Sequence, residues 1–156
     1  MDAHNIGTAR QQLHDQHPSR RLYPDRTTEH RIGAKGEVWF GKRYNLPVDT
    51  TLRKSGDGGV DFDTAIGTID VQTSRINKDF VLVKASKIPR IANIVVFLYW
   101  DESADKIIPK GWIYGYQICN HPIVKIGDNP SHPFWKSHAV PINSLYPIES
   151  LDKSRL

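Results

Sequence analysis

Cysteine is almost absent from the chain, and long apolar runs are absent altogether. The 156 residues include a single thiol, Cys119, which excludes an internal disulfide and a cysteine-rich zinc site. The longest apolar run, from Ile91 to Trp100, is shorter than the roughly 20 residues that a membrane-spanning helix needs. The first thirty residues are polar and do not resemble a signal peptide. These absences predict a cytoplasmic protein that does not enter a membrane.

Several familiar constellations are missing as well. The seven histidines do not follow a metal-ligand spacing, and no nucleophile elbow is present, although a Ser-His-Asp triad assembled from distant residues stays open. Hydrophobic residues make up 38% and charged residues 24% of the chain, which is typical of a globular domain. At this length, one domain with a substantial core is expected.

The net charge of +4 is unevenly distributed along the chain. Residues 1–54 contain ten Lys or Arg against six Asp or Glu, whereas the two kinds balance in the rest of the chain. A basic N-terminal part beside an acidic centre suits a polyanionic partner held over a metal site. A solubilising surface charge explains the same excess equally well.

Hydrophobic periodicity predicts an α/β fold with a mixed β-sheet flanked by helices. One long helix is expected, from an N-cap at Thr27 or Thr28 to about Tyr44. Its three glycines weaken its helix propensity, so packing must hold it. A turn or short helix is expected over 84–90, interrupted by Pro89. Strands are predicted over 48–52, 60–64, 67–74, 80–83, 94–100, 111–118 and 139–142, with a polar loop over 101–110.

Three regions follow from this pattern: a flexible basic arm over 1–26, a domain over 27–150 and a frayed tail over 151–156. The arm lacks periodicity and contains several arginines. Either these arginines follow a phosphate backbone, or the arm is a solvated tail, and the composition favours the second interpretation.

The most informative segment covers residues 57–72 and has the pattern of a β-hairpin with a carboxylate on each arm. Asp61 follows a glycine-rich approach, and Asp70 lies on the return strand, where aspartate has a poor β propensity. Two converging carboxylates form a hard oxygen site that suits Mg²⁺ or Mn²⁺, and the Val71 carbonyl is a plausible third oxygen. Two further aspartates have ordinary explanations, as turn or solvent-face residues: Asp57 and Asp63.

The order of these residues resembles the PD-(D/E)XK nuclease superfamily, in which a helix glutamate precedes a strand aspartate and an Asp/Glu-X-Lys element. Glu37 matches the helix position, Asp61 matches the strand aspartate, and Asp70-Val71-Gln72 occupies the third element. The resemblance covers roughly residues 30–150, and the closing portion is similar to small phage and bacterial members. It implies a restriction-endonuclease-like fold and a Mg²⁺-dependent deoxyribonuclease that acts on DNA inside a cell, a host cell if the protein is phage-encoded.

The resemblance also implies roles for individual residues. The metal ligands would be Asp61, Asp70 and the Val71 carbonyl, with Glu37 serving a second ion or a metal-bound water. Small hydroxyls and cations commonly contact backbone phosphates, and here the candidates are Thr73, Ser74, Arg75, Lys84, Lys35 and Arg43. Many relatives dimerise to cut both strands, so a homodimer is a further expectation.

Gln72 departs from the superfamily pattern, which has a lysine there to position the attacking water and offset charge on the phosphate. Glutamine donates a hydrogen bond but has no charge, and losing one preorganised group slows catalysis by about 10²–10³. Three explanations compete: an inactivated form, natural tolerance of other residues, or a cation from another element. Lys84 is the preferred substitute, ahead of Lys87 and Arg75. The alternative function is a catalytically silent DNA-binding protein or assembly factor of the same fold.

Overall fold

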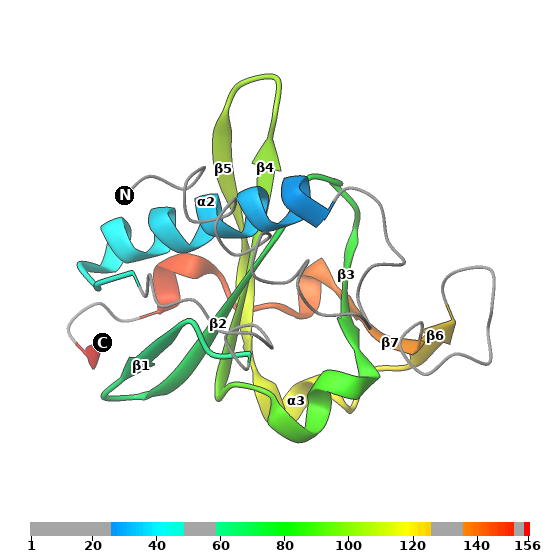
Figure 1. The fold of residues 1–156 in the computed structure, drawn as a ribbon. Helices are drawn as coiled ribbons and strands as arrows, with labels where there is room; N and C mark the ends of the chain where they lie inside the picture. The colour runs from blue at the N-terminus through cyan, green and yellow to red at the C-terminus, as the bar shows by residue number, and fades with distance from the viewer. Residues whose placement is uncertain (1–25, 49–58, 126–135, 152–154) are drawn as a thin grey trace, which may run out of the picture.

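The computed structural model describes residues 26–48, 59–125, 136–151 and 155–156, which form one long helix, two β-sheets and several short helical turns (Figure 1). The fold is mixed α/β with a mixed sheet, as the sequence predicted. The arm predicted over 1–26 lies outside the described residues except for Arg26, and so do Asp57 and most of the strand predicted over 48–52. No described helix is long and apolar enough to cross a bilayer.

Helix α2 spans Arg26–Tyr44 and therefore begins one or two residues before the predicted N-cap at Thr27 or Thr28. Lys42 and Arg43 lie in the last turn, where cations interact favourably with the helix dipole. The buried positions of the helix are mostly apolar or small: Ile32, Ala34, Gly36, Glu37, Phe40, Gly41 and Tyr44. Glycines at buried positions let the helix backbone approach the sheet closely.

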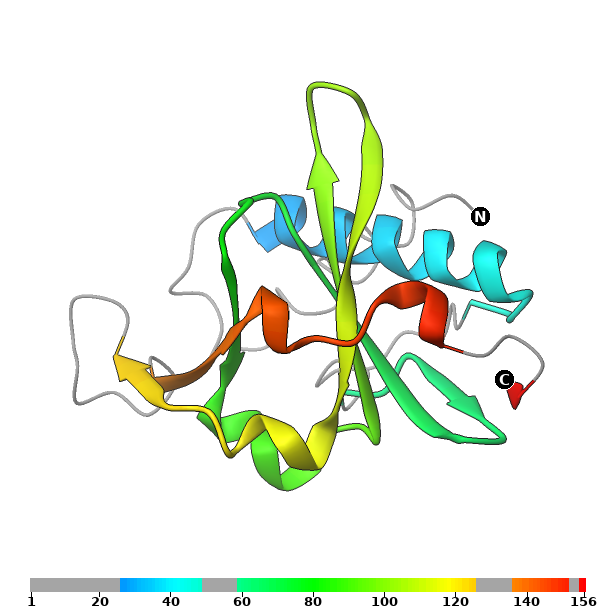
Figure 2. The same ribbon diagram turned by 180° about the vertical axis from the view of Figure 1, so that it is seen from behind.

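A four-stranded sheet, in the order β1-β2-β4-β5, lies behind α2 in Figure 1 and in front of it in Figure 2. Its strands are β1 Phe62–Thr64, β2 Gly67–Ser74, β4 Ile94–Asp101 and β5 Lys106–Tyr114. β1 and β2 form an antiparallel hairpin, β2 and β4 are parallel, and β4 and β5 are antiparallel. The hairpin predicted from residues 60–74 is confirmed.

Different layers cover the two faces of this sheet. On one face, Phe40 of α2 packs in a cluster with Ile69 and Val71 of β2. On the other face, Val95 and Phe97 of β4 belong to a second cluster that α2 does not join. The almost continuous burial of β4 confirms the prediction of a strand covered on both sides.

A second, antiparallel sheet of three strands completes the core of that other face. Its order is β3-β7-β6, with β3 at Phe80–Lys84, β7 at Lys136–Pro141 and β6 at Ile123–Lys125. Val83 of β3 and Val140 of β7 lie in the same cluster as Val95 and Phe97. A 3-10 helix, η2 at Ala85–Arg90, follows β3, so the second of the two alternatives predicted over 84–90, a turn or a short helix, is the one observed.

Two predictions about the second half of the chain are wrong. The loop expected over 101–110 is partly strand, because β5 begins at Lys106 and pairs there with Asp101. The strand expected over 111–118 stops at Tyr114, and a short helix, α3 at Gly115–Ile118, follows it. The aromatic alternation of this segment imitates a strand, whereas the side chain of Gln117 accepts a hydrogen bond from the Tyr114 N–H and caps the helix.

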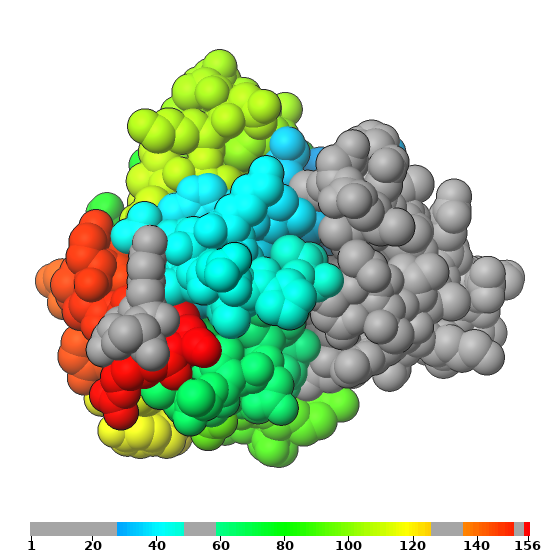
Figure 3. Space-filling model, turned by 90° about the vertical axis from the view of Figure 1, so that its left-hand side faces the viewer, coloured from blue at the N-terminus to red at the C-terminus, as the bar shows by residue number. Residues whose placement is uncertain are grey.

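The C-terminal segment packs against the helix and the hairpin. Two 3-10 helices, η4 at Ile142–Ser144 and η5 at Ile148–Ser150, lead to Leu151, which is buried in the same cluster as Phe40. Figure 3 shows this segment in red beside α2 in cyan and the hairpin in green. The first residue of the tail predicted over 151–156 is therefore a core residue.

Candidate metal centre

The β1–β2 hairpin places Asp61 beside the part of β2 that contains Asp70. The last ladder pair is Phe62 with Ile69, and the register does not continue beyond it, because Asp61 also pairs with Ile69. The Asp61 N–H donates to the Ile69 carbonyl at 2.8 Å. The Asp61 carboxylate accepts a 2.7 Å hydrogen bond at Oδ2 from the Val71 N–H, so it lies one peptide unit from the Asp70 backbone.

The Val71 carbonyl lies on the same side of β2 as the Asp61 carboxylate. In an extended strand the N–H and the C=O of one residue point to the same side, and the Val71 N–H points at Asp61. The ladder between β1 and β2 ends at Phe62 and Ile69, two residues before Val71. Carboxylate and carbonyl oxygens are ligands that hard divalent cations accept, so this backbone oxygen suits the predicted third ligand.

Asp70 and Gln72 share the face of the sheet that α2 does not cover. Their parallel partners on β4 are Val95 and Phe97, which lie in the cluster of that other face. The Gln72 amide donates from Nε2 to Asp70 Oδ2 at 2.9 Å. Residues two apart on a strand point to the same face, so the neutral amide of Gln72 reaches the Asp70 carboxylate.

Glu37 is buried on α2, at the layer that covers the opposite face. Its neighbour Gly36 lies so close to β2 that a Cβ there would be 1.8 Å from Thr73 Oγ1. Among the described residues, no group of three or more His, Cys, Asp and Glu is placed to hold a metal ion. The structure thus brings the Asp61 carboxylate to the peptide that follows Asp70, and within the described residues Glu37, Asp61 and Asp70 do not form one three-carboxylate cluster.

Burial separates these three carboxylates from the other acids. Within the described residues, the buried Asp and Glu are Glu37, Asp61 and Asp70, with 5%, 8% and 6% of their surface exposed. No Lys or Arg of the described part is buried. Buried carboxylates are costly to keep charged unless hydrogen bonds or cations stabilise them. The buried acids of the described part are therefore the three acidic residues predicted for the site, whereas Asp63 is exposed on β1 as predicted.

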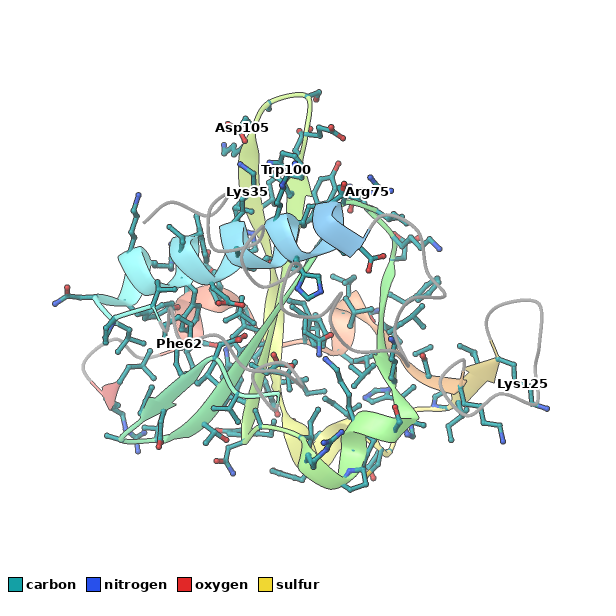
Figure 4. All side chains as sticks on the ribbon, in the orientation of Figure 1. Lys35, Phe62, Arg75, Trp100, Asp105 and Lys125 are labelled. Carbon is teal, nitrogen blue, oxygen red and sulfur yellow. The ribbon has the colours of Figure 1, made fainter. Side chains whose placement is uncertain are left out.

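The predicted phosphate contacts fall into two groups. Ser74, Arg75 and Lys84 are exposed, and Figure 4 shows Arg75 just beyond the end of β2. The Ser74 hydroxyl accepts a hydrogen bond from the Ile76 N–H at 3.0 Å, which fixes the turn after β2. Lys87, the further substitute cation, is half-buried in η2.

The other three candidates are engaged within the fold. Thr73 lies under α2, and its hydroxyl is buried without a hydrogen-bond partner in the described part of the chain. Arg43 lies over the ring of Trp39, 5.4 Å from its centroid. Lys35 Nζ lies 3.4 Å from Asp105 Oδ1 and 5.0 Å from the centroid of the Trp100 ring (Figure 4).

Asn93 positions the hairpin, although no sequence pattern singled it out. Its side-chain oxygen accepts hydrogen bonds from the Thr68 N–H at 2.9 Å and from the Thr68 hydroxyl at 3.0 Å. Gly67 beside it has φ +121°, and a Cβ there would be 2.7 Å from the Asn93 side-chain oxygen. This contact fixes the start of β2 against the start of β4, and hence the height of Asp70 on the sheet.

The interpretation of the site rests on the residues of this chain, because comparisons with known proteins give no match. No family model matches the chain, and neither a curated protein nor a solved structure is significantly similar to it.

Proposed function

We propose that the chain is a Mg²⁺- or Mn²⁺-dependent enzyme that hydrolyses phosphodiester bonds of DNA inside the cell, with a restriction-endonuclease-like fold. The observation that carries this proposal is the hairpin contact in which the Asp61 carboxylate accepts a hydrogen bond from the Val71 N–H, at the peptide that joins Val71 to Asp70. It supplies two buried carboxylates and one strand carbonyl, a donor set that fits a hard divalent cation.

Asp61, Asp70 and the Val71 carbonyl would hold the ion in this proposal. When bound, such an ion neutralises phosphate charge and lowers the pKa of its bound water, and both effects speed phosphodiester hydrolysis. The Val71 N–H orients the Asp61 carboxylate, and the Gln72 amide orients the Asp70 carboxylate. Glu37 is assigned an assisting role from α2, as a buried carboxylate that binds a second ion or its water.

DNA contacts are assigned to the exposed residues at the end of the acidic strand and beyond it. Arg75 follows β2 directly, and Lys84 ends β3, so both present positive charge on the segment after the hairpin. Cations bind backbone phosphates without reading the base sequence. The proposal thus concerns the DNA backbone and makes no assignment of sequence preference.

The test is metal-dependent cleavage of plasmid, linear and branched DNA by the wild-type chain and by Gln72→Lys. Cleavage that requires Mg²⁺ or Mn²⁺ and disappears in Asp70→Asn supports the proposal. Unchanged cleavage by Asp70→Asn would mean that the activity arises elsewhere or from a contaminant. Strong cleavage by Gln72→Lys alone would identify the wild-type chain as a silenced nuclease.

A catalytically silent DNA-binding protein or assembly factor is the second candidate. The neutral Gln72 favours it, because the described site then contains no cationic side chain within the Asp70-Val71-Gln72 element to stabilise the developing phosphate charge. Tight DNA binding without cleavage by either the wild type or Gln72→Lys would select this candidate.

A further inference from the structure

Lysine side chains lie over aromatic rings on the surface that joins the end of β2, the start of β3 and the β4–β5 hairpin. Lys78 Nζ lies 5.5 Å from the centroid of the Phe80 ring, and Lys110 Nζ lies 5.3 Å from the centroid of the Tyr99 ring. Lys110 also donates a hydrogen bond to Oδ1 of Asn77, the residue before Lys78, so the two pairs belong to one surface. We call this set, together with the neighbouring arginine, the cation–ring surface: Arg75, Lys78, Phe80, Tyr99 and Lys110.

The position of Lys110 depends on an irregularity of β5. The β4–β5 ladder shifts register between Phe97 and Leu98, and there it skips Lys110. A residue inserted by a β-bulge turns its side chain away from the regular alternation of the strand. In this protein the inserted residue carries its ammonium group to the ring of Tyr99.

The segment between β2 and β3 is held at both ends. Ser74 pairs with Tyr99 in the parallel ladder, and its hydroxyl accepts a hydrogen bond from the Ile76 N–H at 3.0 Å. At the other end, the Asp79 carbonyl accepts a hydrogen bond from the Ile142 N–H at 2.8 Å. A segment fixed in this way loses less conformational entropy when it binds a partner.

The cation–ring surface is accessible and basic. Arg75 and Lys78 are exposed, and Figure 4 shows Arg75 beside the base of the projecting β4–β5 hairpin. Lys110 is half-buried, and Phe80 has 40% of its surface exposed. The segment from 74 to 80 contains one carboxylate, that of Asp79. Three cations against one carboxylate favour an anionic partner.

The rings restrict the kind of anionic partner. Cations alone suit the phosphates of any nucleic acid, whereas an accessible ring also stacks on a base. In a duplex the faces of the bases are covered by neighbouring base pairs, so stacking on a side chain requires an unpaired strand.

We infer that the cation–ring surface binds an unpaired segment of DNA, with a base stacked on Phe80 and phosphates at Lys78 and Lys110. The inference rests on the proposed function for the choice of DNA as partner, and it adds the form of DNA that is bound. It does not require the metal site, because binding is measurable without cleavage.

The experiment measures the fluorescence anisotropy of a labelled oligothymidylate of about 16 nucleotides, in EDTA, at several salt concentrations. Phe80→Ala should weaken binding by about 5- to 150-fold without changing its salt dependence, because a ring has no net charge. Lys78→Met and Lys110→Met should each reduce the slope of log affinity against log salt by about 0.7, the contribution of one phosphate contact to a single strand. Affinity for a fully paired duplex should not change in Phe80→Ala.

Matched control variants remove a ring or a cation elsewhere on the surface. Tyr116→Ala removes a side chain that is 71% exposed, and Lys125→Met removes the exposed cation at the end of β6 (Figure 4). Both should bind the oligonucleotide like the wild type. Phe80→Leu keeps apolar bulk without an aromatic face and should also weaken binding, and thermal unfolding verifies that each variant is folded.

The outcomes separate this inference from the proposed function. If the wild type binds the oligonucleotide but both folded Phe80 variants and Lys110→Met bind it equally well, the inference is overturned, whereas metal-dependent cleavage by the wild type still supports the proposed function. An equal loss of affinity in Tyr116→Ala also overturns it. Binding with the expected losses but without cleavage retains the inference and contradicts hydrolysis. If the wild type neither binds nor cleaves DNA, both proposals fail.

Discussion

Two regions of this molecule use aspartate in opposite ways. At the hairpin, Asp61 and Asp70 are buried and held by donors of β2, namely the Val71 N–H and the Gln72 amide. At the tip of the β4–β5 hairpin, Asp105 is exposed, accepts from Trp100 Nε1 at 3.1 Å and lies 3.4 Å from Lys35. Figure 4 shows this second group at the projecting end of the molecule.

The difference teaches how to separate a candidate site from a surface ion pair. Asp105 has both a nearby cation and a hydrogen bond. Solvent screens such an exposed ion pair, so it contributes little to the free energy of unfolding. The carboxylates of Asp61 and Asp70 are oriented by donors of β2, and their burial costs free energy because they lose hydration. Burial of like-charged groups on neighbouring strands is the feature that calls for a functional explanation.

The largest expected effect lies at the hairpin. In the Gln72→Lys background, Asp70→Asn should lower DNA cleavage by at least about 10²-fold, because a charged ligand is lost while the shape is kept. Asp105→Asn in the same background should leave cleavage unchanged. Initial rates of plasmid nicking are measured for both variants, and an equal loss of rate in the two would contradict the distinction between the hairpin acids and Asp105.

Two glycines of α2 test whether close packing over β2 maintains the buried region. A Cβ at Gly36 would lie 1.8 Å from Thr73 Oγ1 and 3.2 Å from a Leu98 methyl, so Gly36→Ala should lower the free energy of unfolding by about 1–3 kcal/mol. A Cβ at Gly33 meets no atom within 4 Å, so Gly33→Ala should raise it by about 0.5–1 kcal/mol. Urea denaturation measures both, and a stabilised Gly36→Ala would contradict the close approach.

Tyr44 tests a buried polar group that lies outside the site. Its hydroxyl donates to the Ile148 carbonyl at 3.1 Å, so Tyr44→Phe should cost about 1 kcal/mol of unfolding free energy near neutral pH. Burial raises the pKa of the Tyr44 hydroxyl above its ordinary value. The matched control is Tyr116→Phe: Tyr116 is 71% exposed, and this change should leave stability unchanged.

The sign of the alkaline effect at Tyr44 follows from linkage. A raised pKa in the folded state means that the unfolded chain loses this proton first, so the stabilisation is complete below the ordinary pKa and is lost as pH rises through the folded one. Wild-type stability should therefore fall above about pH 10, and Tyr44→Phe should lack that part of the decline. Identical alkaline declines in the two proteins would refute the assignment.

The smallest effect is expected at the exposed pair. The hydrogen bond from Trp100, together with the nearby Lys35 charge, holds the pKa of Asp105 below its ordinary value. Its small stabilisation is present above the ordinary aspartate pKa and is lost as pH falls through the folded value. Carboxyl NMR titration should show that Lys35→Met and added salt each raise this pKa. If neither changes the pKa of Asp105, Lys35 and Asp105 do not form an ion pair in solution.

The local features of the fold were predictable from the sequence, and the long-range ones were not. The hairpin, α2 and β4 follow from short-range periodicity and turn residues, and their bounds agree within about two residues. The start of β5 was missed because Lys106, Pro109 and Lys110 flank its two isoleucines, so the segment lacks a clear strand pattern and gains strand structure by pairing with β4. The helix α3 was missed because the aromatic spacing of its segment has the period of a strand.

The candidate site divides in the same way. Asp61 and Asp70 were predictable because a single hairpin carries both. The face on which Asp70 points depends on its parallel pairing with Val95, which sequence reasoning did not supply. The hydrogen bond from Gln72 and the anchoring by Asn93 depend on that same long-range register.

The parallel pairing of β2 with β4 sets the order in which the chain is able to assemble. The two arms of the acidic hairpin are separated by a short turn and close quickly, whereas β4 joins only after β3 and η2 have crossed between the two strands. During refolding, the acidic pair thus forms before its shielding layers arrive. The cost of removing both carboxylates from water therefore arises only in the later step, when α2 and β4 pack against the hairpin.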